Sequence, residues 1–304
     1  MASGDTRGSR RPAADGAGPG ERRGGRPRAR PRGALYGSQV DRYLRLLRVG
    51  FRTADFPTLT QLTLAHAARV PFENVSKLYR MQRGGLVGVP TIDAHLEGIE
   101  RFHFGGTCYA VNSHLFSLLR ALGYEVELRG ADMREPDAHL VIVARVEGRE
   151  YLVDAGYAAP FLHPLPLDLP RQQEIVHGED RYVLHPRDEA GRSRLALWRR
   201  GKRVHGYVLK PGPRHVGEFA GVVARSFAPG AVFMRTVLLT RYAPGDSVAI
   251  HGPRLLRCEG ERVAARTIDG RDGLLEEVER WFGIPAHVTA KAVTRIDRLE
   301  DPWQ

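Results

Sequence analysis

Cysteine is scarce in this chain, since 304 residues include only Cys108 and Cys258. Two cysteines cannot form the disulfide framework of a small secreted protein, so the composition favours a reducing compartment. Long apolar runs are also missing, because arginines interrupt LVIVARV and AVFMRTVLL well short of the roughly 20 residues that a membrane span needs. The N-terminus lacks the apolar core of a secretory signal. We therefore expect a cytoplasmic protein with no membrane partner.

The first 34 residues contain no aromatic and no branched apolar residue. They hold nine arginines against three acids, a charge of +6 that leaves +5 of the net +11 for the rest of the chain. Such a segment cannot bury enough surface to offset the entropy of ordering, so residues 1–36 are predicted to be a disordered basic tail. Without aromatics between the arginines, base stacking has no support. We expect no nucleic-acid partner, apart from phosphate contacts that this tail could make.

Helical periodicity dominates residues 37–122. In SQVDRYLRLL, apolar residues recur at intervals of three and four, which is typical of a helix with one buried face. PTLTQLTLAHAARV and IDAHLEGIERF show related patterns, and a last helix is predicted from Cys108 to just before Gly123, a residue type that often follows a helix end. Pro71 predicts an extended or irregular segment over residues 69–79.

The period changes to two after Gly123. Short segments such as YEVELRGADM and RVHGYVLKP are rich in valine, leucine and tyrosine and are separated by turn residues, which predicts an antiparallel β barrel or sandwich over residues 123–210. Residues 211–304 mix both patterns, with helices expected in EFAGVVARSF and GLLEEVERWFGI and strands in FMRTVLLTRY and DSVAIHG. The chain thus reads as α+β, with a helical domain at 37–122, a β domain at 123–210 and an α/β domain at 211–304.

Cys108 stands at the start of the last predicted helix of the helical domain, in FGGTCYAVN. The unpaired N–H groups and positive dipole end of a helix N-terminus lower a thiol pKa. Gly105 and Gly106 allow a substrate to approach closely. Cysteine is also among the most buried residue types, so this arrangement alone is more often structural. Cys258 has no glycine pair and no helix start beside it, and we interpret it as structural.

A nucleophilic cysteine needs a base and a group that orients the base. His139 begins the predicted strand HLVIVARV, and Asp154 lies near the end of REYLVDAGY. If Glu147 and Gly148 form a two-residue hairpin turn, the two side chains are diagonal neighbours on one face. A three-residue loop would put them on opposite faces, so unrelated strand ends remain an open interpretation. The histidines show no metal-ligand spacing, and no metal is predicted.

Three segments together resemble the arylamine N-acetyltransferase family. VPFENVS (70–76) is similar to its I-P-F-E-N-L element, and GGTCYAVN (105–112) is similar to its R-G-G-x-C-F-E-x-N element. HLVIVARVEGREYLVDAGY (139–157) is similar to its H-x-x-L-x-V-x-x-x-G-x-x-Y-L-V-D-x-G-F element. Order and spacing also agree, and weaker similarity runs from SQVDRYL to the C-terminus. The resemblance covers everything except the N-terminal tail.

The resemblance implies an N-acyltransferase whose catalytic triad matches Cys108, His139 and Asp154. The fold would be a helical bundle, an antiparallel β barrel and a C-terminal α/β lid around a cysteine-protease-like catalytic core. The reaction would be ping-pong: Cys108 takes an acetyl group from acetyl-CoA as a thioester, and an aromatic amine or hydrazine then takes the group from Cys108. Acetyl-CoA would be a co-substrate, and no permanently bound cofactor is expected.

Further residues are assigned to the same site. The residues predicted to bind substrate are Phe72, Gly105, Gly106, Thr107, Tyr157 and Phe227. The residues predicted to support the site structurally are Glu73, Asn74 and Asn112. For the aromatic residues, packing in the core is an equally good interpretation, and for Asn112 the alternative is a local hydrogen bond within its helix.

Two positions depart from the family pattern. Its arginine before Gly-Gly is Phe104 here, and its glutamate two residues after the cysteine is Ala110. We interpret this as the exchange of a buried polar network for apolar packing, which can leave stability unchanged when all partners change together. Glu73 would then need a new cationic partner, for which Arg69 and Arg101 are the candidates.

Several alternatives keep the same fold. An amide synthase that uses a carrier-protein thioester, or a cysteine hydrolase, would also need a Cys-His-Asp triad. A catalytically idle scaffold would keep the fold without a reactive thiol. A comparison of acyl donors distinguishes the enzymes from one another, and the rate of Cys108 alkylation distinguishes them from the scaffold.

Overall fold

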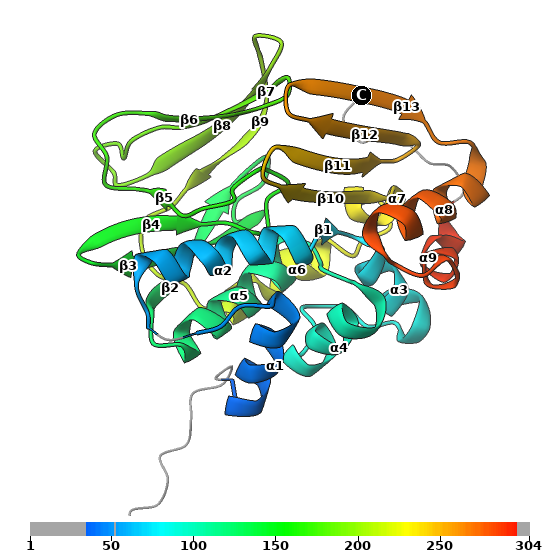
Figure 1. The fold of residues 1–304 in the computed structure, drawn as a ribbon, viewed down its shortest axis with the longest axis horizontal. Coiled ribbons are helices and arrows are strands. Elements are labelled where there is room, and N and C mark those ends of the chain that lie inside the picture. Colours follow the sequence, from blue (N-terminus) through cyan, green and yellow to red (C-terminus); the bar gives the residue numbers. More distant parts are fainter. Residues whose placement is uncertain (1–34, 52, 297–304) are drawn as a thin grey trace, which may run out of the picture. The chain divides into compact units, whose positions relative to one another are not determined.

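The computed structural model describes residues 35–51 and 53–296 (Figure 1). Helices and β-sheets both contribute to this part, in agreement with the predicted mixture of α and β structure. The basic tail that we predict over residues 1–36 falls outside the described residues, apart from Leu35 and Tyr36.

The first part of the described chain is mainly helical, as its periodicity predicts. Two of these helices begin at side-chain caps, because Asp55 accepts a hydrogen bond from the Thr58 N–H at 2.9 Å and Thr91 accepts one from the Ala94 N–H at 3.3 Å. The helices are α1 (Gly37–Leu47), α2 (Phe56–Arg69), α3 (Val75–Gly84), α4 (Ile92–Phe102) and α5 (Cys108–Ala121).

The segment after Pro71 differs from its prediction. Only the short strand β1 (Phe72–Glu73) is extended, and α3 begins at Val75. The prediction is wrong because a proline restricts its own backbone and that of the preceding residue, while the residues after it stay free to form a helix. The Glu73 carboxylate stabilises this helix start, since it accepts a hydrogen bond from the Ser76 N–H at 2.8 Å.

The larger sheet is antiparallel and has eight strands in the order β5-β4-β3-β2-β9-β8-β7-β6. It curls, as Figure 1 shows at the upper left. Its strands are β2 (Glu125–Asp132), β3 (His139–Val146), β4 (Arg149–Val153), β5 (Leu165–Pro166), β6 (Gln173–His177), β7 (Asp180–Leu184), β8 (Ser193–Arg199) and β9 (Lys202–Leu209). The period-two pattern after Gly123 therefore predicts this sheet correctly.

The hairpin between β3 and β4 has the predicted two-residue turn. Glu147 and Gly148 have φ values of 53° and 76°, as a type I′ turn requires. Val146 accordingly pairs with Arg149, and the ladder continues to Ile142 opposite Val153. This register puts the first residue of β3 and the residues just after β4 at the same end of the hairpin.

The smaller sheet has five antiparallel strands in the order β1-β10-β11-β12-β13. One strand, β1, comes from the helical part of the chain, and four come from its C-terminal part. The new elements are η1 (Val216–Phe219), α6 (Ala220–Arg225), α7 (Val232–Arg235), β10 (Leu238–Ala243), β11 (Asp246–His251), β12 (Arg254–Glu259), β13 (Arg262–Thr267), α8 (Gly270–Phe282), α9 (Ala286–Ala292) and η2 (Val293–Arg295).

The C-terminal predictions are partly correct. Helices form in EFAGVVARSF and GLLEEVERWFGI, and DSVAIHG forms β11. The expected strand in FMRTVLLTRY begins only at Leu238, because residues 232–235 form α7. The predictions did not include β12, β13 or α9. Strand β13 is exposed along its whole length, so its sequence carries no apolar alternation from which a strand could be recognised.

The helix that carries Cys108 lies at the centre of the largest apolar cluster. Helix α5 packs on β2 and β3 of the eight-stranded sheet and on helices α1 and α4. Ten of its fourteen residues are buried, so it has almost no polar face. A helix buried on all sides is held rigidly by its neighbours. Its first residue, Cys108, is therefore fixed relative to the hairpin that begins at His139 and is followed by Asp154.

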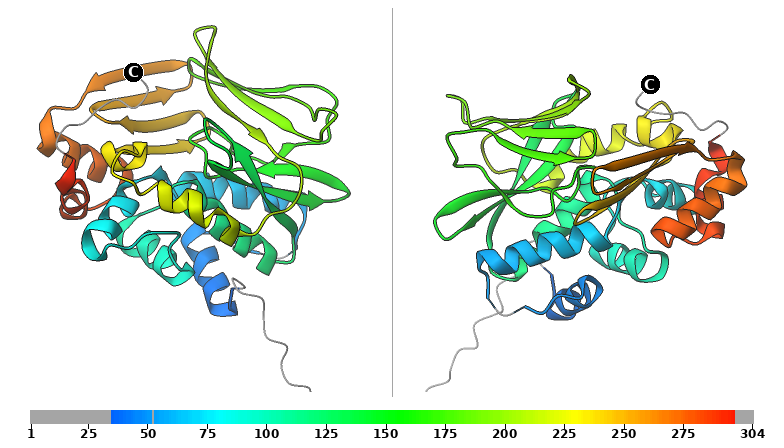
Figure 2. Two further views of the ribbon diagram at one scale, coloured as in Figure 1. Left: turned by 180° about the vertical axis from the view of Figure 1, so that it is seen from behind. Right: turned by 45° about the horizontal axis from the view of Figure 1, so that its top comes forward.

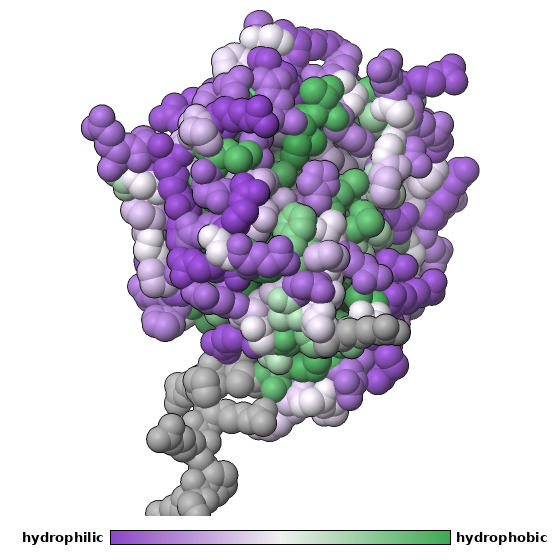
Figure 3. All heavy atoms as spheres, turned by 60° about the vertical axis from the view of Figure 1, so that its left-hand side comes forward, coloured by the Kyte–Doolittle hydropathy of each residue, from purple (hydrophilic) through white to green (hydrophobic). Residues whose placement is uncertain are grey.

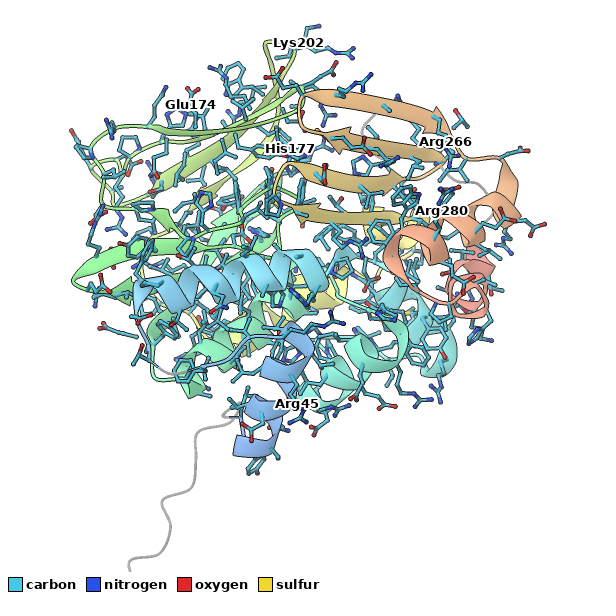
Figure 4. The ribbon with its side chains drawn as sticks, in the orientation of Figure 1. Arg45, Glu174, His177, Lys202, Arg266 and Arg280 are labelled. Carbon is cyan, nitrogen blue, oxygen red and sulfur yellow. The ribbon has the colours of Figure 1, made fainter. Side chains whose placement is uncertain are left out.

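The two sheets lie side by side in the further views of Figure 2. His177 at the end of β6, labelled in Figure 4, contacts the Ser247 hydroxyl on β11 at 2.7 Å. The face drawn in Figure 3 is mostly hydrophilic, with scattered apolar side chains. Within the described part of the chain, no helix is long and apolar enough to cross a membrane.

Candidate active site

Cys108 is the first residue of α5, and its side chain is buried. The two preceding glycines are required by the packing around it. A Cβ atom on Gly105 would overlap the Pro71 carbonyl oxygen, and Gly106 has a φ of 150°, in the range that favours glycine. The Gly105 N–H donates to the Glu73 carboxylate at 3.0 Å. The sulfur thus lies at the N-terminus of α5. The loop just before this helix, residues 104–107 (the approach loop), is held in one conformation.

His139 and Asp154 meet as the hairpin register requires. The His139 Nε2 atom lies 2.8 Å from the Asp154 Oδ2 atom, and both side chains are buried. Cys108 is near enough to the imidazole to act on its ionisation. Burial acts to lower the pKa of His139, but the Asp154 carboxylate and the Cys108 sulfur outweigh it and raise that pKa to about 10. Asp154 and Cys108 thus both act on the His139 ring.

The Asp154 carboxylate has a full set of donors. In addition to the imidazole, it accepts hydrogen bonds from the Tyr207 hydroxyl at 2.9 Å, the Asn112 side-chain amide at 2.9 Å and the Gly156 N–H at 3.2 Å. A carboxylate that is only 2% exposed costs free energy unless such donors satisfy it. These contacts hold Asp154 in a single orientation toward His139.

Asn112 joins the helix to both strands of the hairpin. Its amide also donates to the Leu140 carbonyl oxygen at 2.6 Å, and its Oδ1 atom accepts from the Ala155 N–H at 3.1 Å. These contacts leave α5, so the alternative of a local helix hydrogen bond does not describe this side chain. Asn112 lies one turn after Cys108 and therefore fixes the distance between the cysteine and the His139–Asp154 pair.

One of the predicted aromatic residues, Tyr157, lies close to the triad. The ring of the buried Tyr157 is 5.6 Å from the His139 ring, and its hydroxyl is 2.6 Å from the His205 Nδ1 atom. The buried Phe227 ring lies 4.0 Å from the Lys77 ammonium. Phe72 is half-buried on β1, where its ring is 6.0 Å from that of Phe233. Thr107 is the residue immediately before α5.

The two other predicted supporting residues join the approach loop to the C-terminal sheet. The Asn74 amide donates to the carbonyl oxygens of Phe233 and Thr236 at 2.9 and 2.7 Å, and its Oδ1 atom accepts from the Leu238 N–H at 2.8 Å. Glu73 is on β1, which pairs with β10. Residues of the PFEN segment therefore connect three parts of the chain.

The positions that depart from the family pattern lie in apolar surroundings. The Phe104 ring packs at 5.2 Å from the Phe102 ring and 5.8 Å from the Tyr79 ring. Ala110 is buried, and even a Cβ atom on Gly106 would lie 2.9 Å from the Ala110 Cβ atom. This packing agrees with the exchange of polar for apolar contacts that the sequence suggests.

The cationic neighbour of Glu73 is Arg80, and the candidates named from the sequence are wrong. Arg101 forms an ion pair with Glu97 at 2.6 Å, and Arg69 is exposed at the end of α2. Burial raises the pKa of Glu73, while its hydrogen bonds and the charge of Arg80 act in the opposite direction. Arg80 lies about one helical turn after Lys77 on the same face of α3, a relation that appears only once residues 75–84 are known to be helical.

Four residues of this region escaped the sequence predictions: Tyr207, Gly156, Lys77 and Arg80. Tyr207 and Gly156 stand in segments recognised as similar to the family, but their contacts depend on which strands become neighbours. Lys77 lies in the segment predicted to be irregular, and Arg80 follows that segment directly. Within the described ranges, no group of three or more His, Cys, Asp or Glu residues could hold a metal ion.

Comparisons with known proteins identify relatives of this chain. The sequence model of the family described as N-acetyltransferase matches residues 55–292. Arylamine N-acetyltransferase of Mycolicibacterium smegmatis is 31% identical over 249 residues, which cover 76% of this chain and 86% of that enzyme. Human arylamine N-acetyltransferase 1 is 28% identical over 153 residues, which cover 46% of this chain and 48% of that enzyme.

Two solved structures share the fold. Arylamine N-acetyltransferase from Salmonella typhimurium superposes with a TM-score of 0.73 at 18% identity, covering 86% of this chain and 99% of that one. The Mycobacterium marinum enzyme in complex with CoA gives a TM-score of 0.70 at 20% identity, covering 85% and 98%. Together with the family match over most of the sequence, these similarities show that the chain belongs to the arylamine N-acetyltransferase family.

Proposed function

We propose that this enzyme transfers an acetyl group from acetyl-CoA to the nitrogen of an arylamine or arylhydrazine through a thioester on Cys108. The observation that carries the proposal is the buried hydrogen bond between His139 and Asp154 next to Cys108, which begins α5. The relatives named arylamine N-acetyltransferase support the acceptor, and the CoA complex of the Mycobacterium marinum enzyme supports the donor.

In the first half-reaction, the Cys108 thiolate attacks the carbonyl carbon of the acetyl thioester. The bond from that carbon to the CoA sulfur breaks, and the CoA sulfur leaves with the electron pair. The His139 imidazolium donates its proton to this leaving sulfur. The raised pKa of His139 suits this step, because it means that the ring carries a proton before CoA departs.

In the second half-reaction, the amine nitrogen attacks the carbonyl carbon of the Cys108 thioester. Neutral His139 accepts the proton that the nitrogen loses, and Cys108 leaves as a thiolate, which restores the starting enzyme. Asp154 does not exchange a proton in either step. Its hydrogen bond to Nε2 keeps the opposite ring nitrogen directed at Cys108 and stabilises the imidazolium.

The larger architecture has a matching role in this proposal. Residues 37–122 supply Cys108, residues 123–210 supply His139 and Asp154 on a barrel-like sheet, and residues 211–304 act as a lid over a cysteine-protease-like core. Phe72, Tyr157 and Phe227 would contact the aromatic acceptor, and Gly105, Gly106 and Thr107 would contact the acyl group. Glu73, Asn74 and Asn112 would hold these segments together.

Intact-protein mass spectrometry tests the thioester. We expect incubation with acetyl-CoA to add one acetyl group to the wild-type chain and none to Cys108→Ser. Addition of an arylamine should remove the group and yield an N-acetylated product. The variant Cys258→Ser is the matched control, because that cysteine contacts the Gly260 carbonyl oxygen far along the chain from the triad and should not affect labelling. If acetyl-CoA leaves the wild-type protein unmodified, the proposal that acetyl-CoA is the acyl donor is wrong. A carrier-protein thioester would then be tested as the donor.

A further inference from the structure

Lys77 is a buried lysine that the mechanism above does not use. Lys77 is only 4% exposed and lies on the first turn of α3. The ammonium donates hydrogen bonds to the Ser226 carbonyl oxygen and to the Ser226 hydroxyl, both at 2.7 Å. It also lies 4.0 Å from the centre of the Phe227 ring and 5.5 Å from that of Phe233. All of these partners are neutral.

A buried ammonium without a counter-charge is costly, so the charges around Lys77 must be identified. Among the described residues, no carboxylate forms an ion pair with it. Glu73, the buried carboxylate nearest in sequence, is directed at the N–H groups of Ser76 and Gly105. The ionisable groups that act on Lys77 are Cys108 on α5, which favours its charge, and Arg80 on α3, which opposes it.

The surroundings place Lys77 near the start of α5, the helix that begins with Cys108. A small hollow between α3, the start of α5 and the segment after α6 is lined by Lys77, Arg80, Gly106, Thr107, Ala110 and Ser226. Thr107 directly precedes Cys108 in the sequence, and Gly106 and Ala110 are each two residues from it. Burial lowers the pKa of Lys77 to about 8, and the negative charge of Cys108 acts to raise it again. Ala110 contributes no carboxylate that could neutralise the lysine.

We propose that Lys77 is the buried counter-cation of the Cys108 thiolate and that it acts as a second positioning residue beside His139. Each charged group of the region then has a partner of opposite charge. Arg80 neutralises Glu73, and the His139 imidazolium neutralises Asp154. The Lys77 ammonium neutralises the thiolate. The proposal rests on Cys108 being the nucleophile.

The pairing has a consequence for each half-reaction. Attack on the donor converts the thiolate into a neutral thioester, which leaves the Lys77 ammonium without its counter-charge. Release of the acetyl group to the amine regenerates the thiolate and restores the pair. Lys77 therefore stabilises Cys108 as a leaving group in the second half-reaction. Its bonds to Ser226 also hold the segment after α6 next to the site.

The pH profile of Cys108 alkylation by iodoacetamide tests this inference. Both Lys77→Gln and Lys77→Met remove the charge, and the glutamine keeps an N–H that can reach toward Ser226. We expect each to move the midpoint of the alkylation profile upward by about one pH unit or more, the range that one nearby opposite charge produces. Lys77→Arg should restore the wild-type midpoint. Lys202→Met, which removes an exposed lysine, is the control and should leave the profile unchanged.

The outcomes separate this inference from the proposed function. Suppose that the wild-type protein gains an acetyl group but both neutral variants keep the wild-type alkylation midpoint. This result would overturn the role of Lys77 and leave the proposed acetyltransferase function unaffected. Loss of alkylation rate without a change of midpoint would also overturn it, because that result indicates a purely structural lysine. Wild-type protein that neither acquires acetyl nor alkylates faster than a model thiol would overturn the proposed function itself. Circular dichroism of each variant confirms that it is folded.

Discussion

The backbone of Gly156 lies against the nucleophile and shows how little space each residue of the site has. A Cβ atom at this position would lie 2.7 Å from the Cys108 Cα atom and 2.7 Å from the Asn112 side-chain nitrogen. Real Cβ atoms do not approach other atoms so closely, so any side chain here must push α5 away from the hairpin. Gly156 also donates its N–H to Asp154. The distance between Cys108 and the His139 imidazole therefore depends on residue 156 having no side chain.

We predict that Gly156→Ala lowers kcat/KM for acetyl transfer by about 100-fold, because a displacement of the order of 1 Å between reacting groups costs this much. Thermal unfolding followed by circular dichroism should still show a folded protein. Gly50→Ala is the matched control, since a Cβ atom at Gly50 meets nothing within 4 Å. An alanine variant at 156 with wild-type activity would show that the helix and the hairpin can separate without harm.

The elements that hold the site are a hairpin and a pair of strands with an irregular register. Strands β8 and β9 shift their pairing between Leu197 and Trp198, and Gly206 on β9 stands opposite Ala196. Gly206 has a φ of 145°, and a Cβ atom there would overlap the Leu195 carbonyl oxygen. Glycine is therefore required at this irregularity. The strand then continues to Tyr207, whose hydroxyl reaches Asp154.

We predict that Gly206→Ala destabilises the protein by more than about 1 kcal/mol, since alanine cannot adopt this backbone conformation without strain. Urea denaturation, with the midpoint and the slope both measured, gives the change in the free energy of unfolding. Gly217→Ala, at a position with open space and no positive φ, should change it by less than half as much. Equal denaturation midpoints for the Gly206 variant and wild type would contradict the requirement for glycine.

At the scale of the whole molecule, the stability of the protein depends on pH through the protonation of three histidines buried in its helical region. His66 on α2 contacts the Tyr43 hydroxyl at 3.0 Å, and the rings of His95 on α4 and His114 on α5 stack at 4.4 Å. Burial is the main cause that lowers the pKa of His66 to about 3 and that of His114 to about 4, and it lowers the pKa of His95 as well. All three rings are neutral in the folded protein at neutral pH.

We predict that the melting temperature falls as the pH falls from about 6.5 to about 4. The folded-state pKa values are lower than the unfolded value of 6.5, so the unfolded chain binds protons in this window that the folded chain cannot. The stabilising effect of the neutral rings is thus fully present above pH 6.5. His139 has the opposite sign, because its raised pKa adds stability that is lost as the pH rises above 6.5 toward 10.

Differential scanning calorimetry across this pH range checks the acid side. His114→Gln keeps a side-chain N–H for the Pro90 carbonyl oxygen, which is 3.0 Å from Nε2, and removes one titrating ring. It should flatten the dependence of the melting temperature on pH between 6.5 and 4. His163→Gln replaces an exposed histidine and should leave that dependence unchanged. The same pH dependence in both variants would show that His114 contributes nothing to acid unfolding.

Local features of the sequence determined much of the candidate site. The position of Cys108 at a helix start follows from the glycine pair and the apolar run after it. The meeting of His139 and Asp154 follows from the length of one turn, because a two-residue loop fixes the register of the hairpin and hence the face of every side chain on it. These inferences succeed because each depends on residues close together in the chain.

Only the tertiary structure decided the contacts between elements that are distant in sequence. It brought Tyr207 to Asp154, Gly156 to Cys108, and Lys77 to Ser226. The pattern of residues 69–79 did not reveal the helix that carries Lys77 and Arg80, so their place in the hollow near the start of α5 could not be expected. The physical reason is that the period of a segment shows which face is buried, whereas the partner of that face depends on how all the elements pack together.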